Sequence, residues 1–91
     1  MSEKEIRQAI EISYSSGTVM ETIHRLEPKM NIDDIILTVN TLKNLAHEAY
    51  TKQDTEKGEK LIQLWRKYNS ENFEKLSGLE LSKYINKTIS K

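Results

Sequence analysis

The chain has 91 residues, no cysteine and a formal net charge of zero, with 14 basic and 14 acidic side chains. The absence of cysteine excludes disulfides, thiolate metal sites and cysteine nucleophiles, and zero net charge excludes a global field that would steer the chain toward nucleic acid or an acidic membrane. No segment approaches the roughly 20 apolar residues of a membrane span, and residues 1–5 lack the basic and apolar order of a signal peptide, so we expect a cytoplasmic protein with no membrane contact.

Two helices are predicted near the N-terminus by a hydroxyl residue followed three positions later by glutamate, which is a helix-start signal. Ser2 supplies the signal for a helix over about 2–15, which ends before Gly17. The same signal predicts a short helix over 18–26, which ends because Pro28 disfavours helical geometry in the residue before it. The inner faces of the two helices are expected to carry Ile6, Ala9, Ile10, Tyr14, Val19 or Met20, Ile23 and Leu26.

A long amphipathic helix is predicted over residues 31–53. Asn31 marks its start, and Asp33 and Asp34 place negative charge in the first turn, where it suits the helix dipole. Apolar residues then recur at steps of three and four and form one stripe. Leu37 falls almost opposite this stripe at roughly 100° per residue. The stripe consists of Ile32, Ile35, Ile36, Val39, Leu42, Ala46, Ala49 and Tyr50.

The rest of the chain is also predicted to be helical. A helix over about 55–68, started by Asp54, has a wide apolar arc and is expected to be the most buried helix. Phe73 and Leu76 are expected in a connecting turn or short helix, followed by a last helix over 78–90. No segment alternates as a strand does. The predicted fold is therefore all-α, a compact bundle of four to five helices around a long central helix, with all 91 residues in one domain.

Catalysis has little support in the sequence. The two histidines, His24 and His47, lie on different predicted helices. Glu21 and His24 have the Glu-x-x-His spacing of di-iron bundles, but the second copy is missing because Asn44 precedes His47 by three positions. A surface histidine beside a capping glutamate is the simpler interpretation. We therefore expect a non-enzymatic protein with no catalytic residue, no metal, no cofactor and no small-molecule substrate.

Residues 6–45 follow the order of a helix-turn-helix segment. Residues 9–17 (AIEISYSSG) resemble the first helix and glycine turn of homeodomain-like proteins, and residues 18–26 (TVMETIHRL) resemble their short second helix. The helix that begins at Asn31 then takes the place of the recognition helix. The resemblance implies a nucleic-acid-binding regulator that reads base edges with this helix. The residues of this helix that could contact bases are Thr38, Asn40, Thr41, Lys43 and Asn44. Independently of the resemblance, Lys83, Lys87 and Lys91 recur at four-residue steps and form a basic stripe on the last predicted helix, which would hold phosphates in such a regulator.

Protein–protein binding is the function that the sequence favours most broadly. Ile12 and Leu37 lie off the apolar stripes of their helices, and uncovered aliphatic residues on a charge-balanced surface are typical of an association face. Asp33 and Asp34 place negative charge where phosphates would need donors. The alternative for Leu37 is a core position in a helix packed on two sides. We expect a small accessory or regulatory protein whose partner is another protein or a second copy in a homodimer. The predicted partner-binding residues are Ile12, Leu37, Asn40, Asn44 and Glu48.

Overall fold

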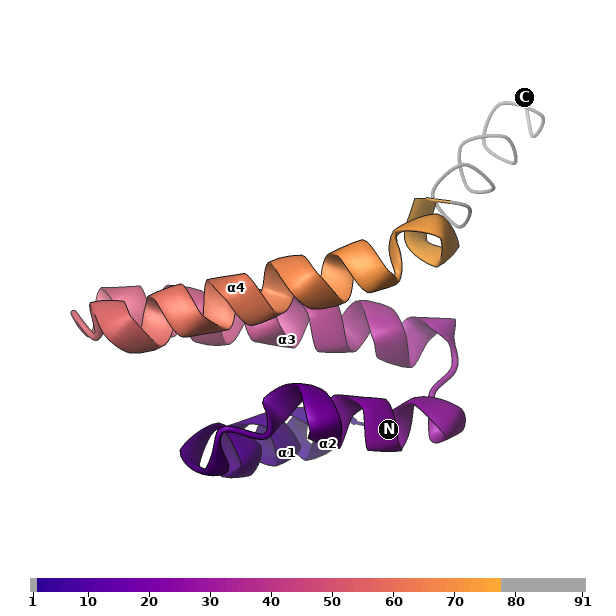
Figure 1. Ribbon diagram of the computed structural model, residues 1–91, viewed down its shortest axis with the longest axis horizontal. Coiled ribbons are helices and arrows are strands. Elements are labelled where there is room, and N and C mark those ends of the chain that lie inside the picture. Colours follow the sequence, from indigo (N-terminus) through magenta and orange to yellow (C-terminus); the bar gives the residue numbers. More distant parts are fainter. Residues whose placement is uncertain (1, 78–91) are drawn as a thin grey trace.

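Two layers of helices make up the part of the chain that the structure describes, residues 2–77 (Figure 1). α3 and α4 pack side by side, and α1 and α2 form the second layer against them. The prediction of an all-α bundle with a long central helix is confirmed, because α3 has 20 residues and contacts both α4 and α1. The computed structural model contains α1 (Glu3–Ser16), α2 (Val19–Leu26), the 3₁₀ helix η1 (Glu27–Lys29), α3 (Ile32–Thr51), α4 (Thr55–Glu71) and a helical segment over 73–77.

The helix predicted over 78–90 lies outside the described residues. Within residues 2–77, no helix is both long enough and apolar enough to cross a membrane.

Side-chain caps form three of the predicted helix starts. Ser2 Oγ accepts a hydrogen bond from the backbone N–H of Glu5 at 3.2 Å, and Asp54 caps α4 in the same way. At the start of α3, the N–H of Asp34 donates to Asn31 Oδ1 at 2.9 Å, and the N–H of Asn31 donates back to Asp34 Oδ2 at 3.2 Å. This second bond holds the pKa of the Asp34 carboxyl below its usual value. The caps satisfy N–H groups that the first turn of a helix leaves without partners.

The predicted cap at Thr18 is wrong, because its side chain makes no capping hydrogen bond. Gly17 adopts a left-handed conformation with φ of 70°, which favours glycine and closes the end of α1. The backbone N–H of Thr18 then donates to the carbonyl of Ser13 at 2.9 Å. Thr18 is thus held in the turn that ends α1, away from the extended conformation of an N-cap, and α2 begins at Val19.

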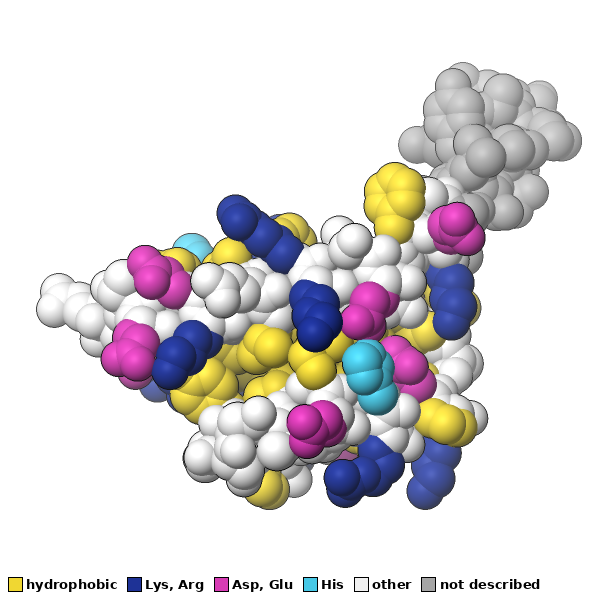
Figure 2. All heavy atoms as spheres, in the orientation of Figure 1, with side chains coloured by type: hydrophobic (Ala, Val, Ile, Leu, Met, Phe, Trp, Pro, Cys, Tyr) yellow, Lys and Arg dark blue, Asp and Glu magenta, His cyan; other side chains and the backbone are white. Residues whose placement is uncertain are grey.

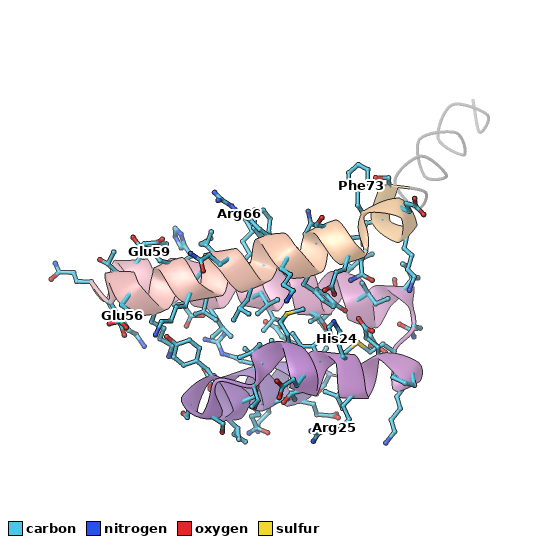
Figure 3. All side chains as sticks on the ribbon, in the orientation of Figure 1. His24, Arg25, Glu56, Glu59, Arg66 and Phe73 are labelled. Atoms are coloured by element: carbon cyan, nitrogen blue, oxygen red, sulfur yellow. The ribbon has the colours of Figure 1, made fainter. Side chains whose placement is uncertain are left out.

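The core lies between the two layers, and α3 is its most buried helix. The expectation that the helix over 55–68 is most buried is wrong, because α3 is flanked by α1 and α4, whereas residues 2–77 cover α4 on its inner side only. The outer side of α4 carries Glu59 and Arg66, and Phe73 follows it; all three point away from the other layer (Figure 3). The core cluster consists of Ile6, Ile10, Val19, Ile23, Ile35, Leu42, Leu45, Ala46, Leu61 and Tyr68.

The buried face of α3 is displaced from the predicted stripe. Thr38 and Thr41 are fully buried, whereas Ile36 and Val39 of the stripe are only partly buried. The two threonine hydroxyls donate to backbone carbonyls four residues earlier, at 2.8 and 2.7 Å. Thr41 lies two turns before Glu48, which hydrogen-bonds to α1. The buried face of α3 therefore differs from the predicted stripe because α1 covers a second side of this helix. That side would be exposed if α3 packed against α4 alone.

Candidate functional site

An apolar groove of about 420 Å³ lies between α2 and α4. Its floor is formed by Tyr14, Val19, Met20 and Leu64, which also pack in or against the core. Figure 2 shows hydrophobic side chains in the hollow between α4 and the α1–α2 layer. We call this feature the α2–α4 groove. Its other lining residues are Gly17, Thr18, Glu21, Lys60, Gln63 and Lys67.

The groove follows from the short length of α2 and the turn before it. α2 has eight residues and buries Val19 and Ile23, so only a narrow face of this helix reaches the core. Gly17 in the preceding turn has no side chain, and a Cβ placed on it would meet nothing within 4 Å. The short helix and the bare turn therefore leave space beside α4 that a longer helix with larger side chains would fill.

Lysines line the α4 edge of the groove. Lys60 Nζ lies 3.1 Å from Glu56 Oε1, and this hydrogen bond raises the pKa of Lys60. Lys57 Nζ lies 5.2 Å from the ring centroid of Tyr14, within cation–π range. Lys67 is exposed and has no ion pair within residues 2–77. The opposite edge, on α2, contributes one glutamate, so the rim is basic on balance.

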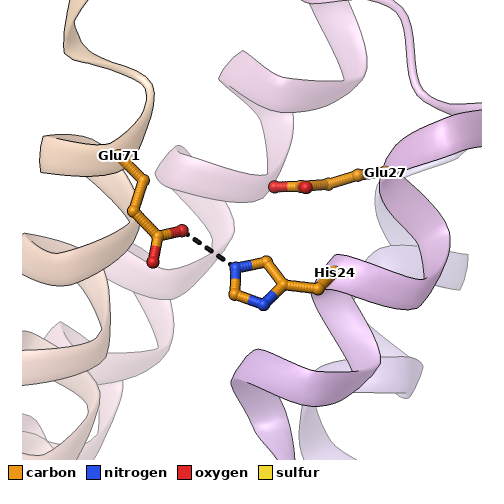
Figure 4. A group of neighbouring side chains, drawn as sticks. All are labelled: His24, Glu27 and Glu71. Atoms are coloured by element: carbon orange, nitrogen blue, oxygen red, sulfur yellow. Dashed lines mark hydrogen bonds and ion pairs between the residues drawn. The ribbon is translucent and has the colours of Figure 1, made fainter.

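A second group of polar side chains borders the groove where α2 passes into η1. His24 Nε2 lies 2.9 Å from Glu71 Oε2, and Glu27 lies close to both (Figure 4). Glu71 is one turn beyond Lys67, which places this His24 cluster (His24, Glu27 and Glu71) next to the groove. Tyr68 lies nearby in the core. Burial raises its pKa to about 12, and the negative charges of Glu27 and Glu71 act in the same direction.

The two aliphatic residues predicted for a partner face differ in exposure. Ile12 is 73% exposed, on the side of α1 opposite Ile6 and Ile10. Leu37 is partly buried and packs against the core. The position of Leu37 off the stripe is explained by the packing of α3 on two sides, so Ile12 is the exposed member of the pair.

The three polar residues predicted for the same face lie on α3. Asn40 and Asn44 are exposed, and Asn44 borders a shallow hollow beside Ile62 of α4. Glu48 accepts hydrogen bonds from the guanidinium of Arg7 and thereby connects α3 to α1.

The contacts implied by the helix-turn-helix resemblance are only partly available. Thr38 and Thr41 are 0% and 1% exposed, so these two side chains cannot reach a base. Lys43 is exposed, but α3 packs against α4 along one side. The predicted phosphate contacts, Lys83, Lys87 and Lys91, lie outside the described residues.

Sequence reasoning missed two members of the His24 cluster. In the described structure His24 bonds to Glu71, 47 residues away, rather than to Glu21. Glu27 follows His24 by three positions, a spacing that places both on one helical face, and this signal is visible in the sequence. Glu71 has no local signal. Comparison of the chain with protein-family models, curated proteins and solved structures gives no match.

Proposed function

We propose that this chain is a small non-enzymatic accessory or regulatory protein that binds a helix of another protein in the α2–α4 groove. The observation that carries the proposal is the apolar floor of Tyr14, Met20 and Leu64, partly covered by the chain's own core and open on its outer side. Docking an amphipathic helix into such a groove is a common mode of peptide recognition, with anchors at three- and four-residue steps.

The volume of the groove is compatible with two or three anchor side chains. Its value of about 420 Å³ lies in the range of about 300–1,000 Å³ typical of ligand pockets. Each fully buried leucine contributes roughly 1.5–3 kcal/mol. After the cost of lost translational and rotational freedom, which is at least about 4 kcal/mol, two or three such anchors correspond to weak binding, with a dissociation constant on the order of millimolar.

The charge on the rim selects the chemistry of the partner. Lys60 and Lys67 line the groove from α4, so the partner helix is expected to carry glutamate or aspartate beside its apolar stripe. Charges at a rim act mainly on association rate and specificity and contribute less to affinity. We therefore assign the apolar floor to affinity and the lysines to the choice of partner.

The proposal is tested with a synthetic amphipathic peptide of about 16 residues that carries leucines at i, i+3 and i+7 and glutamates on its other faces. NMR shift changes on titration should centre on Met20 and Leu64. Leu64→Asp should weaken binding at least tenfold, because it places a charge against the leucine anchors. Lys67→Glu, at an exposed position where folding is not at risk, should lower the association rate and reduce its dependence on salt.

Ile12→Asp is the matched control, because it introduces the same charge at an exposed aliphatic residue outside the groove. It should bind the peptide as the unmodified chain does. The proposal would be contradicted if the NMR shift changes centred on α3, or if Leu64→Asp bound the peptide as tightly as the unmodified chain. Sedimentation of the chain alone checks whether a second copy occupies the groove. If the chain forms a dimer that Leu64→Asp dissociates, the occupant of the groove is a second copy of the chain and not a helix of another protein.

A further inference from the structure

We propose that His24, Glu27 and Glu71 form a binding site for a divalent transition-metal ion of the zinc class. This inference is independent of the proposed function. Its basis is geometric: one ligand atom from each residue lies within 4.8 Å of the other two, on a histidine and two glutamates from α2, η1 and α4 (Figure 4).

The distances are close to those that a metal ion requires. Zinc bonds nitrogen and oxygen at about 2.0–2.2 Å, so donors in a tetrahedral site lie about 3.3–3.5 Å apart. His24 Nε2 and Glu71 Oε2 are 2.9 Å apart and need to separate by about half an ångström. The carboxylate oxygen of Glu27 lies within 4.8 Å of both other ligand atoms, so it needs to move inward by at most about 1.4 Å. All three side chains are at least partly exposed, so they can make these adjustments by changing rotamer.

The charge of the cluster also favours a cation. Glu27 and Glu71 have no ion pair with lysine or arginine in residues 2–77, and Glu71 bonds to His24. Arg25, beside His24 in the sequence, points away from the cluster (Figure 3). The two carboxylates are therefore close together with only an imidazole between them, and a bound divalent ion would neutralise their charge.

The ligand set indicates the class of metal. Imidazole suits zinc, copper, nickel and iron, whereas magnesium and calcium prefer sites made of oxygen ligands alone. Three protein ligands leave a fourth position for water, as in open zinc sites. The ion would join α2 and η1 to α4, three elements that meet here through few other polar contacts.

Binding is measured by calorimetric titration of the tag-free chain with ZnCl₂ and by the visible absorption of the Co²⁺ form. We expect one ion per chain. At an ion concentration about ten times the dissociation constant, the melting temperature should rise by roughly 5 °C or more, because the ion binds the folded state alone. MgCl₂ at the same concentration should have no such effect.

The variants His24→Gln, Glu27→Gln and Glu71→Gln should each weaken binding at least tenfold while keeping the helical circular dichroism. His47→Gln and Glu21→Gln are matched controls at exposed positions outside the cluster, and both should bind as the unmodified chain does. The proposal would be overturned if His47→Gln lost binding, or if the three cluster variants bound the ion as tightly as the unmodified chain. Absence of saturable binding of Zn²⁺ or Co²⁺ by the unmodified chain would also overturn it.

Discussion

Buried hydroxyl groups in this protein are satisfied by their own helices. Thr38 and Thr41 in α3, and Ser13 in α1, each donate to the carbonyl four residues earlier. A hydroxyl bonded in this way carries no unmet polar group into the core. Sequence patterns count threonine as polar, so they assign these positions to the surface, whereas their methyl groups allow them to pack as small apolar residues.

Thr41→Val should change the free energy of unfolding by about 1 kcal/mol or less, because the lost hydrogen bond is offset by an added buried methyl group. Thr41→Asp should lower it by several kcal/mol, because it buries a charge without a partner. Urea denaturation measures both. Similar stability of the two variants would place residue 41 at the surface and reopen its assignment to base contacts.

At the scale of elements, α3 and α4 approach closely where glycine allows it. A Cβ atom built on Gly58 would lie 3.0 Å from ring atoms of Tyr50. Glycine inside a helix costs about 1 kcal/mol relative to alanine. Glycine at position 58 therefore lowers the stability of α4 as a helix but allows the Tyr50 ring to pack directly against the backbone of α4.

Gly58→Ala should stabilise the chain by about 1 kcal/mol in a Tyr50→Ala background, where no ring obstructs the new methyl group. In the unmodified chain the gain should be smaller or reversed. A double-mutant cycle by chemical denaturation measures the difference, which we expect to be about 0.5–1 kcal/mol. Additive effects would show that the ring moves aside without cost.

The positions of the helices were more predictable from the sequence than the choice of which helices pack against one another. The caps at Ser2, Asn31 and Asp54 are local features, and the starts of α1, α3 and α4 follow from them. The buried side of α3 was not predictable in the same way, because a helical stripe shows that one face is apolar and gives no number of packing partners. Leu37 is the clearest case: its position off the stripe is resolved only once α1 is placed beside α3.

At the scale of the whole molecule, the candidate sites depend on residues that are far apart in the chain. The α2–α4 groove combines Met20 with Leu64, and the His24 cluster combines His24 with Glu71. Periodicity describes each helix separately and contains no information on which helices become neighbours. The positions of Ile12 and Leu37 off their apolar stripes led to the hypothesis of protein binding, whereas the location of the groove is visible only once the two layers are packed together.

The stability of the whole fold should fall between about pH 10 and pH 12 through Tyr68, whose pKa rises from 10.0 in the unfolded chain to about 12 in the folded one. A raised pKa means that stability is complete below pH 10 and is lost as the pH rises, because the unfolded chain releases its proton first. The loss should be on the order of 2 kcal/mol for a shift of this size. Denaturation at a series of pH values measures it.

Tyr68→Phe should remove most of this pH dependence, although its stability at neutral pH can differ from that of the unmodified chain. Tyr50→Phe is the control, because Tyr50 is 42% exposed, and it should keep the pH dependence. Identical alkaline profiles for all three proteins would show that Tyr68 ionises without opening the core.

The eight residues of α2 have an energetic consequence for any ligand beside it. Isolated helices shorter than about 12–15 residues are marginal in water, so α2 remains helical only because Val19 and Ile23 are anchored in the core. Segments that rely on so few anchors open with less free energy than the protein as a whole. One wall of the groove is thus weakly held, whereas the other wall, α4, is long and packs along α3. We therefore expect small shifts of α2 to adapt the proposed groove to ligands of different width at little cost to the core.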